Sequence, residues 1–98
     1  MFITFYQNNS GGYFIKDENV CEFVIIEGDS FTEIMYRAEN LFKDYREYCP
    51  CCGERWDDDY KTEKDLTEEP EIYGDPISDL KKECYNKSVI IHWKNEEI

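Results

Sequence analysis

Three cysteines in the middle of the chain have the residue type and spacing that can hold a metal ion. They lie in the segment Cys49-Pro50-Cys51-Cys52-Gly53-Glu54-Arg55-Trp56. Two residues separate Cys49 from Cys52, and the glycine that follows permits a tight turn whose backbone amides point back at sulfur. This arrangement is half of a tetrahedral zinc site. The remaining ligands have no matching spacing, and the candidates are Cys51, Cys21, Cys84 and His92.

The cysteine segment has two other interpretations. A tight turn can simply hold reduced thiols, since an odd number of cysteines does not look like a disulfide framework. A redox dithiol is less favoured, because the nearby acidic residues raise thiol pKa values and no βαβ unit surrounds the motif. A structural zinc site built from Cys49, Cys52 and Cys51 and a metal-free turn therefore both stay open.

A polar loop and an arginine-aromatic group form a second constellation. The loop Gln7-Asn8-Asn9-Ser10-Gly11-Gly12 offers amide groups and close backbone approach to a nucleotide-like ligand, but it is also typical of a hairpin connection. Arg55 can hold an anion while the rings of Trp56 and of the nearby Tyr60 and Tyr73 stack on a base, although Trp56 can equally pack this segment onto the domain. The predicted ligand-binding residues are Gln7, Asn8, Asn9, Ser10, Gly11, Gly12, Arg55, Trp56 and Tyr73.

A strongly acidic stretch follows the cysteines. From Glu54 to Glu71 the chain carries nine acidic residues against three basic ones. Such a stretch can imitate the phosphates of a nucleic acid and occupy a basic groove, or it can be a solvated loop. The predicted partner-binding residues are Asp57, Asp58, Asp59 and Glu63.

Length, charge and hydropathy limit the class of protein. The 98 residues are enough for one domain, 1–98, whose stability is modest without a metal or an oligomeric partner. A net charge of −12 disfavours direct binding to nucleic acid or to an anionic membrane. No apolar run approaches the roughly 18 residues of a membrane span, and the N-terminus does not resemble a signal peptide. We therefore expect a soluble, intracellular protein.

The elements that must position these residues follow from local patterns. Aromatic and β-branched residues predict strands at 2–6, 13–15, 21–27 and 88–93. A capping box at Ser30 and Glu33 and an apolar stripe predict a helix over 31–45, and a shorter amphipathic helix is expected from Pro76. The predicted fold is α+β, with an antiparallel sheet of about four strands, one main helix and a cysteine-containing acidic insertion at 46–75.

No catalytic motif accompanies these features. His92 is the only histidine, and no serine or cysteine can be paired with it by motif. We therefore expect a binding protein without enzymatic activity.

Four segments together resemble a known family. They are Gln7-Asn8-Asn9-Ser10-Gly11-Gly12, Cys21-Glu22-Phe23-Val24-Ile25-Ile26-Glu27, the Cys49–Trp56 segment and Ile72-Tyr73-Gly74. The chain resembles a family of small, uncharacterised bacteriophage proteins known as a domain of unknown function. The resemblance implies an origin in a phage genome and action in the cytoplasm of an infected bacterium. It brings no enzyme activity with it.

Three functions are expected from this combination. The first is a phage counter-defence protein, a homo-oligomer that sequesters a nucleotide-like molecule of bacterial immune signalling. The net charge stands against it, because an acidic surface repels anionic ligands unless the pocket is locally positive. The second is an acidic inhibitor or nucleic-acid mimic of the anti-CRISPR kind, which binds a basic host defence protein. The third is a structural zinc-knuckle adaptor.

Overall fold

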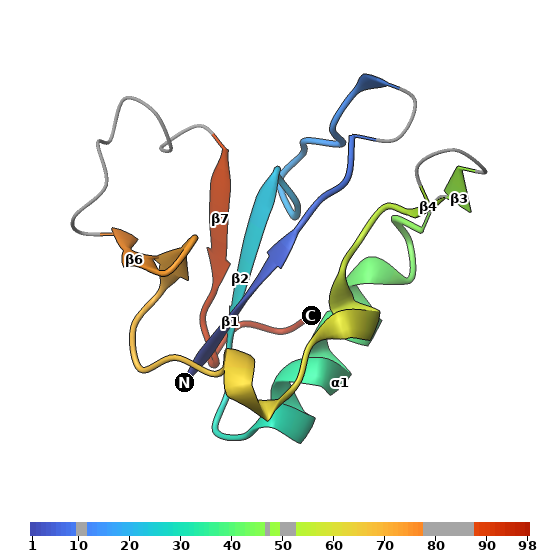
Figure 1. The fold of residues 1–98 in the computed structure, drawn as a ribbon. Coiled ribbons are helices and arrows are strands. Elements are labelled where there is room, and N and C mark those ends of the chain that lie inside the picture. The colour runs from blue at the N-terminus through green and yellow to red at the C-terminus, as the bar shows by residue number, and fades with distance from the viewer. Residues whose placement is uncertain (10–11, 47, 50–52, 78–87) are drawn as a thin grey trace.

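The main sheet has three strands. The computed structural model describes residues 1–9, 12–46, 48–49, 53–77 and 88–98. Strand β2 (Phe23–Glu27) lies in the centre, between β1 (Phe2–Tyr6) and β7 (Val89–His92). Strand β1 pairs antiparallel with β2, whereas β7 pairs parallel with it, so the sheet is mixed (Figure 1).

One face of the sheet is covered by helix α1 (Phe31–Phe42). The helix begins where the capping signal predicts, because the Ser30 hydroxyl accepts a hydrogen bond from the Glu33 backbone N–H at 3.1 Å. Its buried stripe packs against the strand residues that alternation places on the same face. This core contains Ile3, Phe5, Val24, Ile26, Ile34, Ala38, Leu41 and Phe42. No helix in the described ranges is long and apolar enough to cross a membrane.

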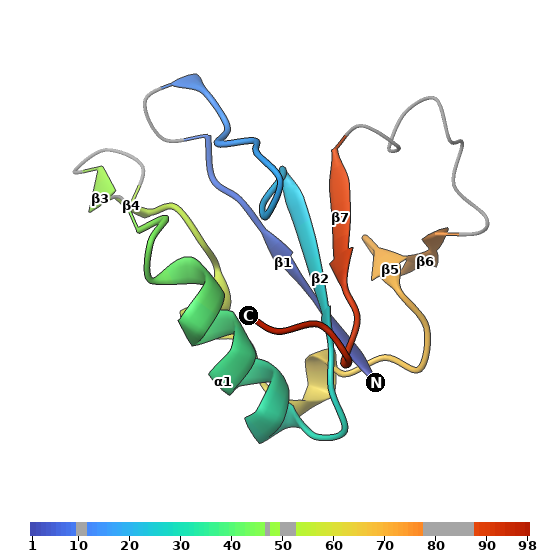
Figure 2. The same ribbon diagram turned by 180° about the vertical axis from the view of Figure 1, so that it is seen from behind.

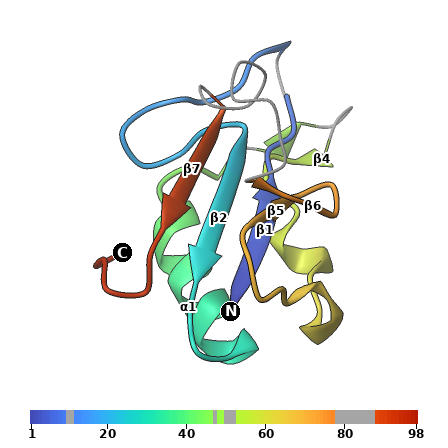
Figure 3. The same cartoon turned by 90° about the vertical axis from the view of Figure 1, so that its left-hand side faces the viewer.

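The opposite face is covered by a small hairpin. Strands β5 (Glu71–Ile72) and β6 (Asp75–Pro76) pair with each other, and Ile72 packs against Phe2, Phe23 and Ile25. Figure 2 and Figure 3 show this hairpin and α1 on opposite sides of the sheet. The sheet is therefore the middle layer of the fold.

The outer edge of β1 is closed by the segment after the cysteines, residues 53–67, which we call the closing segment. This segment contains β4 (Gly53–Glu54), which pairs with β3 (Tyr48–Cys49), and the 3-10 helices η2 (Asp58–Tyr60) and η3 (Glu63–Asp65). Its two ends attach to β1 through the isolated bridges Gln7 to Trp56 and Phe2 to Thr67. Part of the predicted insertion is thus a wall of the domain, because it supplies hydrogen-bond partners to an otherwise open strand edge.

Arg37 of α1 holds the C-terminal segment against the domain. Its guanidinium donates to the backbone carbonyls of Trp93 at 2.8 Å and Glu96 at 2.7 Å, and also to that of Glu27. The chain therefore turns back from β7 toward the helix. Figure 2 shows the C-terminus on the α1 side of the sheet.

The α+β class is confirmed, and the described residues hold one α-helix, but the antiparallel sheet of four strands is wrong. Residues 13–15 form no strand. The Gln7 side-chain amide takes the place of a neighbouring strand, because its oxygen accepts from the Ile15 N–H at 2.6 Å and its nitrogen donates to the Ile15 carbonyl at 3.0 Å. Strand β7 is parallel to β2, because the long connection between them returns the chain to the end of the sheet where β2 began. Pro76 lies in β6 and Ile77 follows it directly, while the remaining residues of the predicted second helix fall in 78–87, outside the described ranges.

Candidate functional site

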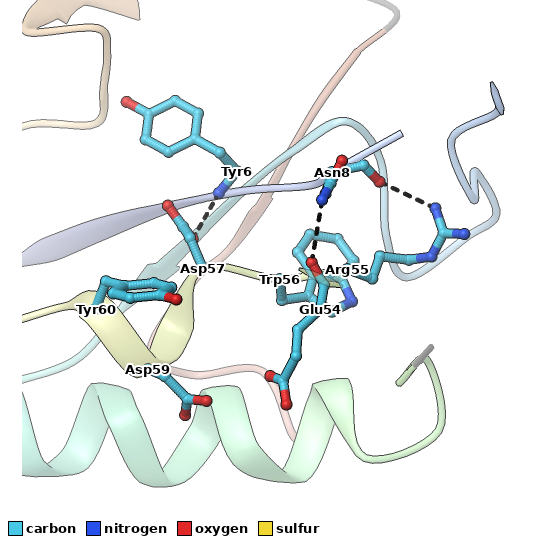
Figure 4. A pocket seen from close by; sticks show the side chains of 8 residues that line it. All are labelled: Tyr6, Asn8, Glu54, Arg55, Trp56, Asp57, Asp59 and Tyr60. Carbon is cyan, nitrogen blue, oxygen red and sulfur yellow. Dashed lines mark hydrogen bonds between the residues drawn. The ribbon is translucent and has the colours of Figure 1, made fainter. Parts of the chain in front are cut away.

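A pocket of about 360 Å³ lies between the end of β1 and the segment that closes its edge. Tyr6 and Asn8 contribute one wall, and residues 54–57 and 59–60 contribute the other (Figure 4). Three of the predicted ligand-binding residues meet here, namely Asn8, Arg55 and Trp56. The pocket thus brings together the polar loop and the arginine-tryptophan pair, which are far apart in the sequence.

Arg55 turns its guanidinium away from this pocket. Figure 4 shows the side chain running toward the loop, where it donates to the Asn8 carbonyl at 3.1 Å. It also donates to the Gln7 side-chain oxygen at 3.0 Å and to the Tyr13 carbonyl at 3.1 Å, and its guanidinium lies 4.9 Å from the centre of the Tyr13 ring. The residue is 1% exposed. Its charge therefore ties the loop to the closing segment.

Gln7 and Trp56 are also internal. Gln7 is buried and donates to the carbonyls of Ile15 and Cys21 at 3.0 and 2.9 Å. Trp56 is 2% exposed and stacks on Phe42, with 4.2 Å between ring centres. Trp56 therefore packs this segment onto the domain, and its role in ligand binding stays a prediction.

The other predicted loop and aromatic residues lie elsewhere. Asn9 is exposed, and its carbonyl accepts from the Gly12 N–H at 2.8 Å, as in a tight connection. Ser10 and Gly11 fall outside the described residues. Tyr73 is 68% exposed in the turn between β5 and β6, where its ring stacks on Tyr6 at 5.2 Å. Tyr73 does not line the pocket, whereas Tyr60, named with it as a stacking ring, does, and so does Tyr6, which sequence reasoning missed.

The three consecutive aspartates have three different environments. The Asp57 carboxylate accepts from the Tyr6 N–H at 3.0 Å and pairs with Lys61 at 3.1 Å, and burial raises its pKa although these contacts oppose the shift. Asp58 is 5% exposed and binds both ends of the Arg46 guanidinium, at 2.8 and 2.7 Å. This hydrogen-bonded pair raises the pKa of Arg46 above its ordinary value. Asp59, like Glu63, is exposed.

The predicted zinc site lies largely beyond the described residues. Cys51 and Cys52 fall outside them, as does Cys84, and only the backbone of Cys49 is described. That backbone pairs with Gly53, whose φ of 82° fits the predicted tight turn. Both ring nitrogens of His92 have contacts on the α1 side of the sheet, with the Asn19 carbonyl at 2.7 Å and the Glu96 carboxylate at 3.3 Å. Zinc binding stays a prediction.

One acidic group in the described residues has the geometry of metal ligands. Carboxylate oxygens of Glu54, Asp58 and Asp59 lie within 4.8 Å of one another. Oxygen ligands of this kind suit calcium or magnesium rather than a thiolate-type zinc site. Asp58 is already bound by Arg46, so one of the three negative charges is compensated within the protein.

The charges that line the pocket are mainly negative. Glu54, Asp57 and Asp59 face it, while the one basic lining residue, Arg55, directs its charge elsewhere. Opposite charges attract most strongly where water is partly excluded. The site therefore favours a cationic group over a phosphate.

Comparison with known proteins places the chain in a family. Searches of curated proteins and of solved structures found no significant match to it. A family model described as a domain of unknown function, DUF7296, matches residues 1–98. Because the match spans well over half of the chain, the protein belongs to the DUF7296 family.

Proposed function

We propose that this chain is a binding protein without enzymatic activity, whose acidic surface engages a basic partner protein. The acidic surface consists of the exposed carboxylates of residues 54–69. These six residues are Glu54, Asp59, Glu63, Asp65, Glu68 and Glu69. Lys64 is the one exposed basic residue in the same segment. This imbalance is the observation that carries the proposal.

The basic residues next to this surface do not offset its charge. Arg46 is bound by Asp58, and Lys61 is bound by Asp57 and has a side chain that is only 10% exposed. Arg55 is buried under the loop. These three positive charges therefore pair with groups of the domain itself and hold the segment in place, whereas the six carboxylates of the acidic surface face the solvent.

A basic groove that binds nucleic acid fits such a surface. The phosphates of a nucleic acid form a dense row of negative charges, and a protein that presents exposed carboxylates on a fixed scaffold can compete for the same groove. The resemblance described from the sequence supplies the setting: a bacteriophage protein that acts in the host cytoplasm against a basic defence protein. That setting is part of the proposal.

Sequestration of a nucleotide-like signal is the second candidate. The observation in its favour is the pocket itself, because Asn8 and the rings of Tyr6 and Tyr60 line it. The three lining carboxylates oppose it, since each repels a phosphate. The predicted homo-oligomer and the zinc-knuckle adaptor stay predictions.

A capture and competition experiment tests the proposal. The immobilised protein is exposed to a bacterial lysate, the retained proteins are identified, and a purified candidate is loaded with fluorescent duplex DNA. We expect the wild type to displace this DNA, and the triple variant Glu63→Gln, Glu68→Gln and Glu69→Gln to displace it much less. The effect of the wild type should also weaken steeply with ionic strength.

A matched control variant tests whether the position of the charges matters or only the net charge of the protein. The triple variant Glu18→Gln, Asp44→Asn and Glu97→Gln changes the net charge equally at exposed positions outside the acidic surface. It should displace DNA nearly as well as the wild type. The proposal is wrong if both triple variants behave alike, or if equilibrium dialysis shows tight binding of ATP or a cyclic dinucleotide that an Asn8→Ala variant loses.

A further inference from the structure

We propose that the pocket between β1 and the closing segment receives an arginine side chain of the basic partner. This inference rests on the proposed function and names the group that the acidic surface recognises. It concerns the pocket lined by Tyr6, Asn8 and residues 54–57 and 59–60. Its volume of about 360 Å³ is at the lower end of the range in which proteins enclose small ligands, roughly 300–1,000 Å³.

The pocket combines an open aromatic ring with two neighbouring carboxylates. Tyr60 is 84% exposed and lies on the short helix η2 beside the pocket, so its ring is open to a partner. Figure 4 shows the carboxylates of Glu54 and Asp59 directed toward the same side of the site. Their oxygens lie within 4.8 Å of each other, a separation that a cation between them would stabilise.

A guanidinium group matches these features better than an ammonium group. It is planar, it stacks on aromatic rings, and its five N–H donors can bind two carboxylates at once. An ammonium group is a compact, strongly hydrated charge: it can lie over a ring, but it has no plane to lay flat against the ring and no fixed fork of donors to span two carboxylates. The pairing of a flat exposed ring with two acceptors therefore selects arginine over lysine.

The protein pairs two of its own cations with carboxylates at the borders of this pocket. The Lys61 ammonium lies 4.8 Å from the centre of the Tyr6 ring and 3.1 Å from the Asp57 carboxylate. Arg46 binds Asp58 with two hydrogen bonds. These contacts engage Asp57 and Asp58 internally; the Arg46 charge also acts on Glu54, but the carboxylates of Glu54 and Asp59 are exposed to solvent.

The test compares oligoarginine and oligolysine peptides of equal length by fluorescence anisotropy. We expect the wild type to bind the arginine peptide several-fold more tightly. The double variant Glu54→Gln and Asp59→Asn should lose about tenfold in affinity for it, equivalent to about 1.4 kcal/mol. Tyr60→Ala should abolish the preference for arginine while lysine binding changes little.

A second double variant is the control. Glu68→Gln and Glu69→Gln remove the same charge from the acidic surface outside the pocket. If both double variants weaken binding equally, or if Tyr60→Ala keeps the preference, the arginine pocket is wrong although the acidic surface still binds basic groups. If the wild type binds neither peptide at low salt, the proposed function itself is wrong.

A metal ion is the other cation that these two carboxylates can bind, and competition with calcium distinguishes it from arginine. If the pocket receives arginine, calcium at about 1 mM should weaken binding of the arginine peptide no more than a sodium salt of equal ionic strength does. If calcium selectively displaces the peptide from the wild type but not from the Glu54→Gln and Asp59→Asn variant, the two carboxylates instead form a metal site. All variants are checked by circular dichroism, and their exposed positions make folding defects unexpected.

Discussion

Replacing Arg55 by methionine tests whether this residue is an internal anchor. The guanidinium donates to three oxygen atoms at 3.0 to 3.1 Å. After the substitution the Gln7 oxygen still accepts from the Ile15 N–H at 2.6 Å. The main loss is therefore the Arg55 donor to the carbonyls of Asn8 and Tyr13. Each buried acceptor left without its donor costs roughly 1–3 kcal/mol. Because these carbonyls are only partly buried, we expect a total loss of about 2–4 kcal/mol.

That loss is large relative to the whole stability. A domain of this size is expected to have a free energy of unfolding of roughly 5–15 kcal/mol. Urea denaturation followed by tryptophan fluorescence measures the change, since Trp56 is buried in the core and reports on its opening. The control is Lys64→Met, at an exposed position, which should change stability by about 0.5 kcal/mol or less. A loss below about 1 kcal/mol for Arg55→Met would refute the anchoring role.

Three further predictions concern stability. Arg37→Met should lower the free energy of unfolding by about 2–4 kcal/mol and speed carboxypeptidase cleavage of the C-terminal segment, because Arg37 donates to its backbone carbonyls. Gly28→Ala should cost about 1–3 kcal/mol by urea denaturation, since the added methyl group meets an Ile34 carbon at 2.7 Å. Burial raises the pKa of Asp57 above its ordinary 3.8, so the folded state binds the proton more tightly. Stability should therefore fall as pH rises from about 3.8 through the folded pKa, and Asp57→Asn should flatten that decline in a pH series of denaturation curves.

Local signals predicted the helix, whereas the sheet depended on contacts that local patterns do not show. Ser30 and Glu33 lie close together in sequence and cap the helix directly. Residues 13–15 have strand-like side chains, but the Gln7 amide binds the backbone of Ile15 in place of a neighbouring strand. The orientation of β7 follows from the path of the long connection after β2, which composition does not reveal.

The sequence placed the polar loop and the arginine-tryptophan pair together only through the motifs that carry the family resemblance. Asn8, Arg55 and Trp56 do line one pocket, but the sequence carries no measure of burial, so Arg55 was expected to bind a ligand. The three aspartates look equivalent in sequence. A 3-10 helix turns once in three residues, and η2 begins at the second of them, so each points in a different direction. Tyr60 was recognised as a possible stacking ring because it is an aromatic residue in a largely charged segment, whereas nothing in the sequence distinguishes Tyr6 from the other strand residues.

The most direct test of the account is to map binding on the protein by NMR. Backbone amide shifts of the isotopically labelled chain are followed during titration with the oligoarginine peptide and, separately, with ATP. We expect the peptide to shift the amides of residues 54–69, most strongly around Tyr60, and ATP to shift none of them. Shifts caused by ATP in the pocket, with the peptide leaving residues 54–69 unchanged, would contradict it.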